Sequence, residues 1–228
     1  MAAGYLNEIQ ALQPDGPYRL GGWSMGGIIA YEMARMLHAR GVQVDLLAVI
    51  DSHLPGPQEL ELLRQDQTLS PAGEVEWMID FAADLSGYYG AGLAIARDHL
   101  LPWPRHEHLQ RVWQAMHETS AALAGISLEH LTVQWSLYRS HRQALGEYLL
   151  GLAEQPTYPG SASLYFAEAA YRGEGGRANL ERELQAWGQR ISGARRETIL
   201  PGDHYSILRD EGLRQLADSL QGLLGDKQ

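Results

Sequence analysis

A short glycine-rich turn around a serine constrains this chain more than any other feature. Residues 22–26 have the pattern Gly-x-Ser-x-Gly. They follow a plausible buried strand over residues 18–23 and precede residues 26–40, where apolar side chains recur at helical spacing. Such a turn between a strand and a helix is typical of a nucleophile elbow, which lifts a serine hydroxyl out of a sheet. We predict that Ser24 is a nucleophile; the alternative is a turn that only packs well.

The geometry of such an elbow would also explain why glycines flank the serine. A sharp turn crowds the positions two residues before and two residues after its apex, so we expect neither Gly22 nor Gly26 to tolerate a Cβ. The helix that follows directs the positive end of its dipole toward the apex, and the next backbone N–H is left free. Both features would stabilise negative charge that develops beside the serine.

The segments around the elbow predict an α/β fold. Residues 42–50 are nearly all apolar, as in a strand covered on both faces of a parallel sheet. Together with the elbow strand and its helix they form a βαβ unit. Further strands are expected over residues 162–167 and 195–200, and further helices over residues 1–13, 177–187 and 209–224. The apolar spacing predicts one apolar face on the first of these helices, with Tyr5, Leu6, Ile9 and Leu12, and an inward face on the last, with Leu213, Leu216, Leu220 and Leu223.

The middle of the chain, residues 56–157, has a different pattern. Apolar stripes at helical spacing recur through it, and no strand pattern is persuasive. We therefore predict a single α/β domain over residues 1–228 with a helical lid insertion over residues 56–157. The four tryptophans of this insertion either line an acyl channel or pack its helices onto the body; packing is the more common role.

Composition excludes several classes of function. The net charge of −10 argues against nucleic acid or an anionic membrane as a partner. The absence of cysteine excludes disulfides, thiolate metal sites and a thiol nucleophile. No signal peptide or apolar run of about 18 residues is present, which fits a cytoplasmic setting. His106 and His108 lack a carboxylate at ligand spacing, so we expect no metal site.

Two further residues complete a candidate catalytic set. Asp51 follows the strand over residues 42–50, and His204 follows the strand over residues 195–200. Functional groups gather at the carboxyl ends of strands in open α/β sheets, and the order Ser, acid, His is that of α/β-hydrolases. Asp51 has an alternative role as a turn residue before a proline. His53 is too close to Asp51 to serve as the base, and the neighbouring Asp203 is a second candidate acid.

Three segments resemble the thioesterase domains that end nonribosomal peptide synthetases and, more loosely, those of polyketide synthases. Residues 17–34 read PYRLGGWSMGGIIAYEMA, residues 47–52 read LAVIDS, and residues 200–208 read LPGDHYSIL. A tryptophan directly before the serine, here Trp23, resembles the pattern of the peptide-synthetase branch. The resemblance covers nearly the whole chain and is vague only in the predicted lid.

The resemblance implies acyl transfer through a covalent intermediate on Ser24. His204 would act as the base, Asp51 would orient it, and the Met25 N–H would stabilise the oxyanion. It implies no cofactor of its own, because the peptidyl or acyl substrate arrives on the phosphopantetheine arm of a carrier protein. Water or an internal nucleophile would then release the acid or the macrocycle.

The resemblance also implies that part of the family's fold is missing. Members have several strands before the elbow, and a loop among them gives a second oxyanion N–H, whereas this chain begins at the helix before the elbow strand. We therefore expect an α/β-hydrolase-like, mostly parallel sheet that lacks the N-terminal strands and leaves the elbow strand at an open edge. Two alternatives remain: a stand-alone esterase or editing thioesterase of the same fold, or an inactive fragment that only docks a carrier protein.

Overall fold

The computed structural model describes residues 1–66 and 71–225, and the chain divides into two compact units. Unit 1 comprises Met1–Gly56 and Glu154–Gln228, and unit 2 comprises Pro57–Ala153. The sheet lies entirely in unit 1, whereas the regular structure of unit 2 is helical throughout its described residues.

Unit 1 is organised around a four-stranded parallel sheet. Its strands are β1 (Tyr18–Trp23), β2 (Val44–Ile50), β3 (Ala162–Ala167) and β4 (Arg195–Leu200), in the spatial order β1-β2-β3-β4. All three pairs are parallel. Because parallel strands share one direction, their carboxyl ends meet at one edge of the sheet, and Trp23 at the end of β1 pairs with the last residue of β2.

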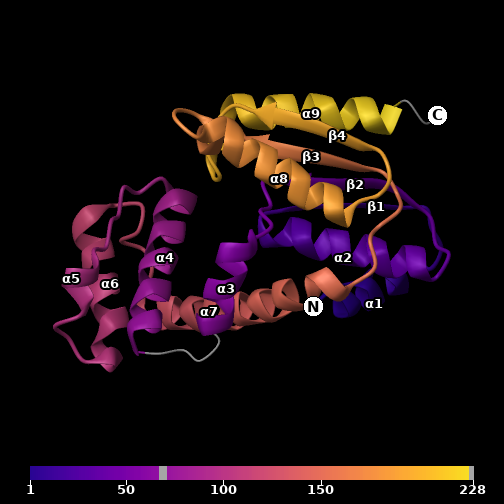
Figure 1. Cartoon of the computed structure of the whole chain (residues 1–228). Coiled ribbons are helices and arrows are strands. Elements are labelled where there is room, and N and C mark those ends of the chain that lie inside the picture. Colours follow the sequence, from indigo (N-terminus) through magenta and orange to yellow (C-terminus); the bar gives the residue numbers. More distant parts are fainter. Residues whose placement is uncertain (67–70, 226–228) are drawn as a thin grey trace. The chain divides into compact units, whose positions relative to one another are not determined.

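Helices cover both faces of this sheet. Figure 1 shows α2 and α8 on one side of the strands and α9 on the other. The helices of the unit are α1 (Ala2–Leu12), α2 (Met25–Ala39), α8 (Gly176–Arg190) and α9 (Asp210–Gly225), with short 3₁₀ turns at Glu168–Tyr171 and Ser206–Leu208. The fold class predicted from the sequence, α/β with a parallel sheet, is confirmed.

The core of unit 1 lies where the inner strands meet these helices. All six residues of β3 are buried, as expected of a strand with neighbours on both edges and helices on both faces. Leu47 of β2 and Trp187 of α8 are fully buried. The unit therefore holds the carboxyl ends of β1, β2 and β4 on a rigid, well-packed support.

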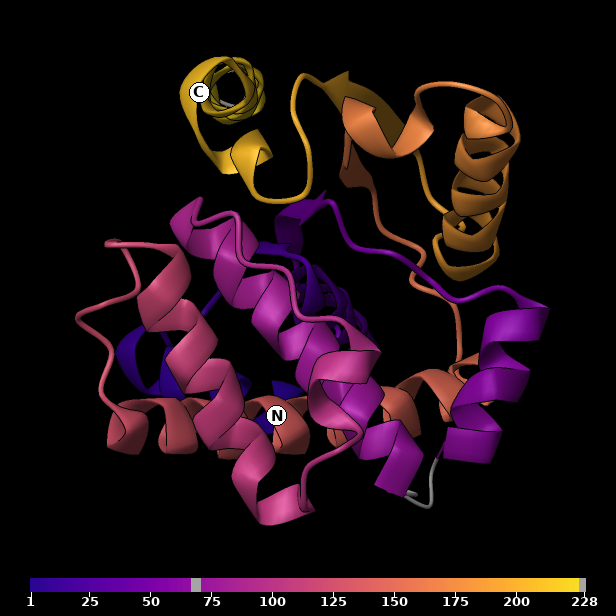
Figure 2. The same cartoon turned by 90° about the vertical axis from the view of Figure 1, so that its left-hand side faces the viewer.

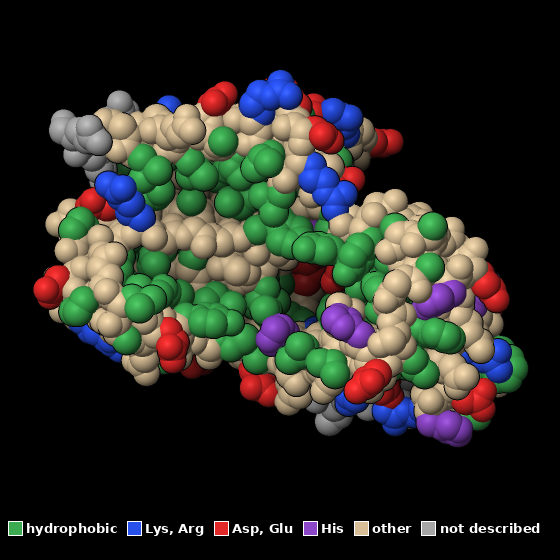
Figure 3. Space-filling view, turned by 180° about the vertical axis from the view of Figure 1, so that it is seen from behind, with side chains coloured by type: hydrophobic (Ala, Val, Ile, Leu, Met, Phe, Trp, Pro, Cys, Tyr) green, Lys and Arg blue, Asp and Glu red, His purple; other side chains and the backbone are tan. Residues whose placement is uncertain are grey.

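The two outer strands of the sheet differ in character. β4 is mostly exposed and begins with Arg195, Arg196 and Glu197, charges that discourage another strand from pairing there. β1 lies at the opposite edge beside an apolar groove of about 510 Å³. Apolar side chains lining the groove come from α1, β1 and α2: Tyr5, Ile9, Leu20, Met25, Ile29 and Met33. Figure 3 shows one face of the molecule with apolar side chains gathered in a hollow.

Two predicted helix faces differ from those observed. On α1 the sequence predicts an inward stripe, and Leu6 is buried, but Leu12 is 89% exposed. On α9 we expected Leu213 to face inward, yet it is exposed. Gly212 takes the inward place instead, where a Cβ would lie 2.7 Å from the Pro201 carbonyl oxygen. Close backbone contact, which a hydrophobic stripe does not reveal, decides the orientation of α9.

Unit 2 has its own hydrophobic core. Its helices are α3 (Pro57–Asp66), α4 (Pro71–Tyr89), α5 (Arg97–Leu100), α6 (Arg105–Thr119) and α7 (Leu128–Gly151). Figure 2 shows α4 and α6 crossing α7 within this unit, and α4, α6 and α7 contact one another. Within residues 1–66 and 71–225, every helix is too short or too polar to span a membrane.

The tryptophans of unit 2 have unequal roles. Trp77 and Trp135 are buried in its core, and Trp113 packs against that core. Trp103 is 41% exposed, with the Arg111 guanidinium over its ring. Core packing within unit 2 accounts for the first three, and packing of these helices onto the body stays a prediction. That the unit acts as a lid stays a prediction.

Candidate active site

Ser24 occupies a strained turn between β1 and α2. Its φ of 55° and ψ of −128° place a non-glycine residue in a region that L-amino acids rarely adopt. Hydrogen bonds from the neighbouring strand end hold it there. The Ser24 N–H donates to the Ile50 carbonyl at 2.8 Å, and the Ser52 hydroxyl donates to the Ser24 carbonyl at 2.6 Å. The end of β2 therefore holds the turn from both sides of its apex.

Close packing around this turn explains one of the two flanking glycines. A Cβ on Gly22 would lie 2.1 Å from the Gly26 carbonyl oxygen and 2.6 Å from the Gly27 nitrogen, so Gly22 must lack one, as predicted. The same prediction is wrong for Gly26, where a Cβ would meet no described atom within 4 Å. The second crowded position is Gly27, whose Cβ would lie 2.1 Å from Ser52 Oγ.

Asp51 is held at the carboxyl end of β2 by the adjoining strand. The residue is 1% exposed and has a φ of 44°. Its N–H donates to the Tyr165 carbonyl at 2.7 Å, and its Oδ1 accepts from the Ala167 N–H at 2.7 Å. Burial by itself would raise the pKa of Asp51, but hydrogen bonds from His204 and Ala167 and the nearby charge of His53 hold that pKa below its ordinary value. The carboxylate is therefore ionised at neutral pH.

The structure brings His204 between Asp51 and Ser24. His204 Nδ1 lies 2.6 Å from Asp51 Oδ2, and His204 Nε2 lies 3.1 Å from Ser24 Oγ. Because an ionised carboxylate can only accept, Nδ1 carries the proton and Nε2 is left to accept from the serine hydroxyl. Three residues from the loops after β1, β2 and β4 thus form one hydrogen-bonded series.

The competing candidates from the sequence have other contacts. The Asp203 carboxylate accepts hydrogen bonds from the Tyr205 and Ser206 N–H groups, so it caps the 3₁₀ turn after His204. His53 Nδ1 lies 3.0 Å from Glu183 Oε1, while its Nε2 is 3.9 Å from Asp51 Oδ2. Neither residue replaces Asp51 or His204 in the series.

Sequence reasoning missed several supports of this site. The Trp23 indole N–H donates to the His204 carbonyl at 2.9 Å, and the Trp187 indole N–H donates to the Ser52 carbonyl at 2.9 Å. Tyr171 lies near enough to Glu183 and Asp51 that burial and these two negative charges raise the pKa of its hydroxyl. The only sequence signal for the first contact was the tryptophan next to Ser24. Nothing in the local sequence pointed to the other two.

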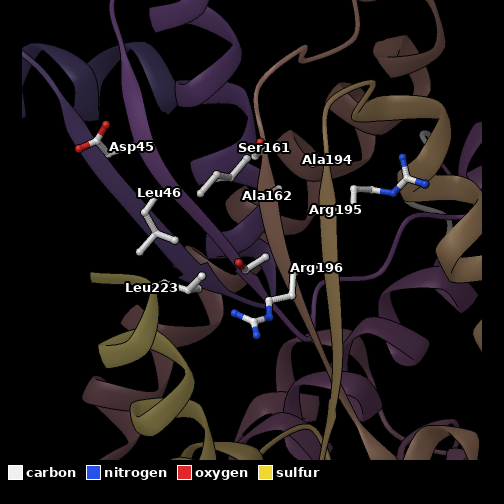
Figure 4. A pocket seen from close by; sticks show the side chains of 10 residues that line it. Asp45, Leu46, Ser161, Ala162, Ala194, Arg195, Arg196 and Leu223 are labelled. Atoms are coloured by element: carbon white, nitrogen blue, oxygen red, sulfur yellow. The ribbon is translucent and has the colours of Figure 1, made fainter. Parts of the chain in front are cut away.

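Two other features of the described residues could hold a ligand. The one group of metal-binding side chains found there is Asp51, His53 and His204, whose ligand atoms lie within 4.8 Å of one another. It overlaps the hydrogen-bonded series. A hollow of about 300 Å³ lies at the amino-terminal ends of β2, β3 and β4, where Figure 4 shows Arg195 and Arg196 pointing to different sides of β4. That is the opposite end of the strands from Ser24.

A hydroxyl, an imidazole and a carboxylate in series at the carboxyl edge of a parallel sheet form the arrangement of α/β-hydrolases. Comparison with known proteins identifies the family of the chain. It belongs to the thioesterase domain family, whose model matches residues 1–224. This family is one of hydrolases that form domains of peptide and polyketide synthetases.

Individual relatives are multidomain synthetases or their parts. A non-reducing polyketide synthase of Pseudevernia furfuracea, PFUR17_0229, is 54% identical over 56 residues, which are 25% of this chain and 3% of that protein. The four-domain nonribosomal peptide synthetase AB3403 superposes with a TM-score of 0.76 and 27% identity over 98% of this chain and 15% of that one. The NocB thioesterase domain, solved as a covalent complex with a fluorophosphonate nocardicin G analog, gives a TM-score of 0.53 and 23% identity. The chain covers 72% of that domain.

Proposed function

We propose that this chain is a serine thioesterase that releases a peptidyl or acyl chain from a carrier protein through an ester on Ser24. The observation that carries the proposal is the series Ser24–His204–Asp51, with contacts of 3.1 Å and 2.6 Å, on a strained elbow. A serine hydroxyl is a weak nucleophile until a base accepts its proton, and His204 Nε2 is within reach to do so.

The first half of the reaction forms the acyl-enzyme. Ser24 Oγ attacks the thioester carbonyl while its proton passes to His204 Nε2. The imidazolium that results is stabilised by the buried Asp51 carboxylate, which remains ionised. The tetrahedral intermediate then collapses, and His204 returns the proton to the leaving thiol.

Stabilisation of the oxyanion comes from the start of α2. Met25 is the first residue of that helix, so its N–H has no carbonyl partner within the helix and lies directly after the nucleophile. The helix dipole adds partial positive charge at the same point. In the second half of the reaction, water or a nucleophile within the bound chain attacks the ester and releases an acid or a macrocycle.

The family membership supports the substrate class. Thioesterase domains of multidomain synthetases act beside carrier proteins, so we assign a carrier protein as the partner and its phosphopantetheine arm as the bearer of the substrate. The triad chemistry itself uses only side chains and backbone groups of this chain. Neither a nucleic acid nor a membrane is part of the proposal.

A covalent serine probe tests the proposal. We expect a fluorophosphonate to label the wild-type chain at Ser24, with no labelling in Ser24→Ala and much slower labelling in His204→Ala. Ser161→Ala is the matched control, because Ser161 is exposed beside the hollow at the other end of the strands. Equal labelling of wild type and Ser24→Ala would refute the assignment.

Substrate assays separate the proposal from a simple esterase. Acyl thioesters of pantetheine or N-acetylcysteamine should be hydrolysed faster than short aryl esters of the same acyl group. A preference for the aryl esters would favour a stand-alone esterase of the same fold. Labelling of Ser24 without turnover of either substrate would favour a domain that binds a carrier protein but does not release its cargo.

A further inference from the structure

Trp23 makes two contacts with the residue proposed as the base. Its indole N–H donates to the His204 backbone carbonyl at 2.9 Å. Its ring stacks on the His204 imidazole, with the centroids 4.7 Å apart and the planes 30° from parallel. We propose that Trp23 is a positioning residue that fixes both the loop and the ring of His204. This inference rests on the function proposed above.

The other contacts of His204 do not restrain its ring fully. The imidazole is bonded at its edge, through Nδ1 to Asp51 and through Nε2 to Ser24. Bonds made in the plane of a ring set its direction but resist tilting out of that plane only weakly. The residue lies on a loop after β4, and its side chain is 29% exposed. An aromatic face at 4.7 Å blocks the tilt that the two hydrogen bonds permit.

The place of Trp23 in the chain makes this support specific. Trp23 and Ser24 are consecutive residues, although His204 is 180 positions away from Ser24. A movement of the elbow therefore carries the nucleophile and the support of the base together. Besides the bond to Asp51, a short link of one peptide unit and one side chain therefore connects Ser24 to the imidazole of His204.

The indole also favours the charged state that the reaction creates. When His204 accepts the serine proton it becomes a cation, and the face of an indole attracts a cation within about 6 Å of its centroid. Attractions of this kind are worth about 2- to 30-fold in rate when they act only on the charged state. Tyr205 adds an edge contact to the same imidazole at 5.1 Å.

Two substitutions at Trp23 separate these effects. Trp23→Phe keeps an aromatic face and removes the N–H, so we expect the labelling rate and kcat to fall about 2- to 13-fold, the usual range for one hydrogen bond. Trp23→Leu removes both, and we expect a further 2- to 30-fold loss. KM for an acyl N-acetylcysteamine thioester should change less than about 2-fold, because the indole is assigned to the base and not to the substrate.

The chain offers a matched control in Trp113. Its indole N–H also donates to a backbone carbonyl, that of Ile126, at 2.8 Å, and its ring lies 4.3 Å from the His117 ring. Trp113→Phe therefore removes the same chemical group beside another histidine, in unit 2. We expect its labelling rate and kcat to equal those of the wild type.

A spectroscopic measurement distinguishes positioning from a general loss of structure. The proton between His204 Nδ1 and Asp51 gives a low-field NMR resonance, which should persist in Trp23→Phe and broaden in Trp23→Leu while the rest of the spectrum stays folded. Wild-type rates in Trp23→Leu, or a loss confined to KM, would overturn the positioning role while labelling of Ser24 still upheld the proposed function. An unlabelled wild type would instead overturn the proposed function.

Discussion

The two glycines that flank Ser24 should respond to alanine with opposite signs. The Cβ of Gly22→Ala would lie 2.1 Å from the Gly26 carbonyl oxygen and 2.2 Å from the Gly26 carbonyl carbon. These are backbone atoms of the first turn of α2, so no side-chain rotation relieves the contact. The Cβ of Gly26→Ala meets nothing within 4 Å.

The magnitudes follow from these distances. Ordinary contacts to a Cβ begin near 3.4 Å, so Gly22→Ala requires the start of α2 to move by more than 1 Å. Overpacking of this kind costs about 1–3 kcal/mol, occasionally more. In Gly26→Ala the unfolded chain loses conformational freedom while the helix accepts the methyl group, and the free energy of unfolding should rise by about 0.4–1 kcal/mol.

Thermal unfolding and fluorophosphonate labelling test this pair together. For a chain of this size each kcal/mol corresponds to about 2–4 °C in Tm. We expect Gly22→Ala to lower Tm by about 2–12 °C and to slow labelling of Ser24 roughly 100-fold or more, because a displacement near 1 Å removes the attack geometry. Gly26→Ala should raise Tm slightly. If Gly26→Ala destabilised the chain as much as Gly22→Ala, the packing described around the elbow would be incorrect.

Three further outcomes are expected from the same structure. Asp51→Asn should keep the fold and lower kcat by up to about 10⁴-fold, because the amide no longer holds the His204 proton on Nδ1, whereas Asp203→Asn, which only loosens a turn, should cost less than about tenfold. Because the pKa of Asp51 is lowered in the folded state, the ionised carboxylate stabilises the fold at pH values above its ordinary pKa of 3.8. This stabilisation is lost as pH falls through the lower pKa of the folded state. Below pH 3.8 the free energy of unfolding of Asp51→Asn should therefore lack this part of the pH dependence, measured by acid unfolding. Trp187→Phe should lower the free energy of unfolding by about 1–3 kcal/mol, measured by urea titration, because the buried Ser52 carbonyl loses its donor.

Local patterns in the sequence were sufficient for the elements of unit 1 and for three candidate residues that the structure brings together, Ser24, Asp51 and His204. That these residues act as a catalytic triad stays a prediction. Strand, turn and helix signals around Ser24 placed the elbow, and strand ends placed Asp51 and His204. They failed where a contact joins distant segments. The exposure of Leu213 depends on how closely Gly212 approaches Pro201, and the crowding at Gly27 depends on the hydroxyl of Ser52. Neither contact leaves a periodic signal in the chain.

The residues of the site differ in the same way: some are placed by neighbouring segments of one sheet unit, and one lies on a distant loop and is placed by side-chain contacts. Ser24 and Asp51 lie within one βαβ unit, and the end of β2 both presents Asp51 and holds the strained elbow through Ile50 and Ser52. Ser24 and Asp51 are thus placed by the sheet itself.

His204 reaches them on a separate loop after β4, so the position of its imidazole depends on side-chain contacts that the sheet does not supply. Substitutions that loosen that loop should therefore reduce the rate while leaving the fold and the elbow intact. Substitutions under the elbow, at Gly22 or Gly27, should damage stability and rate together. Measuring both quantities for each variant would show whether the loop of His204 or the elbow limits the rate at which Ser24 is labelled.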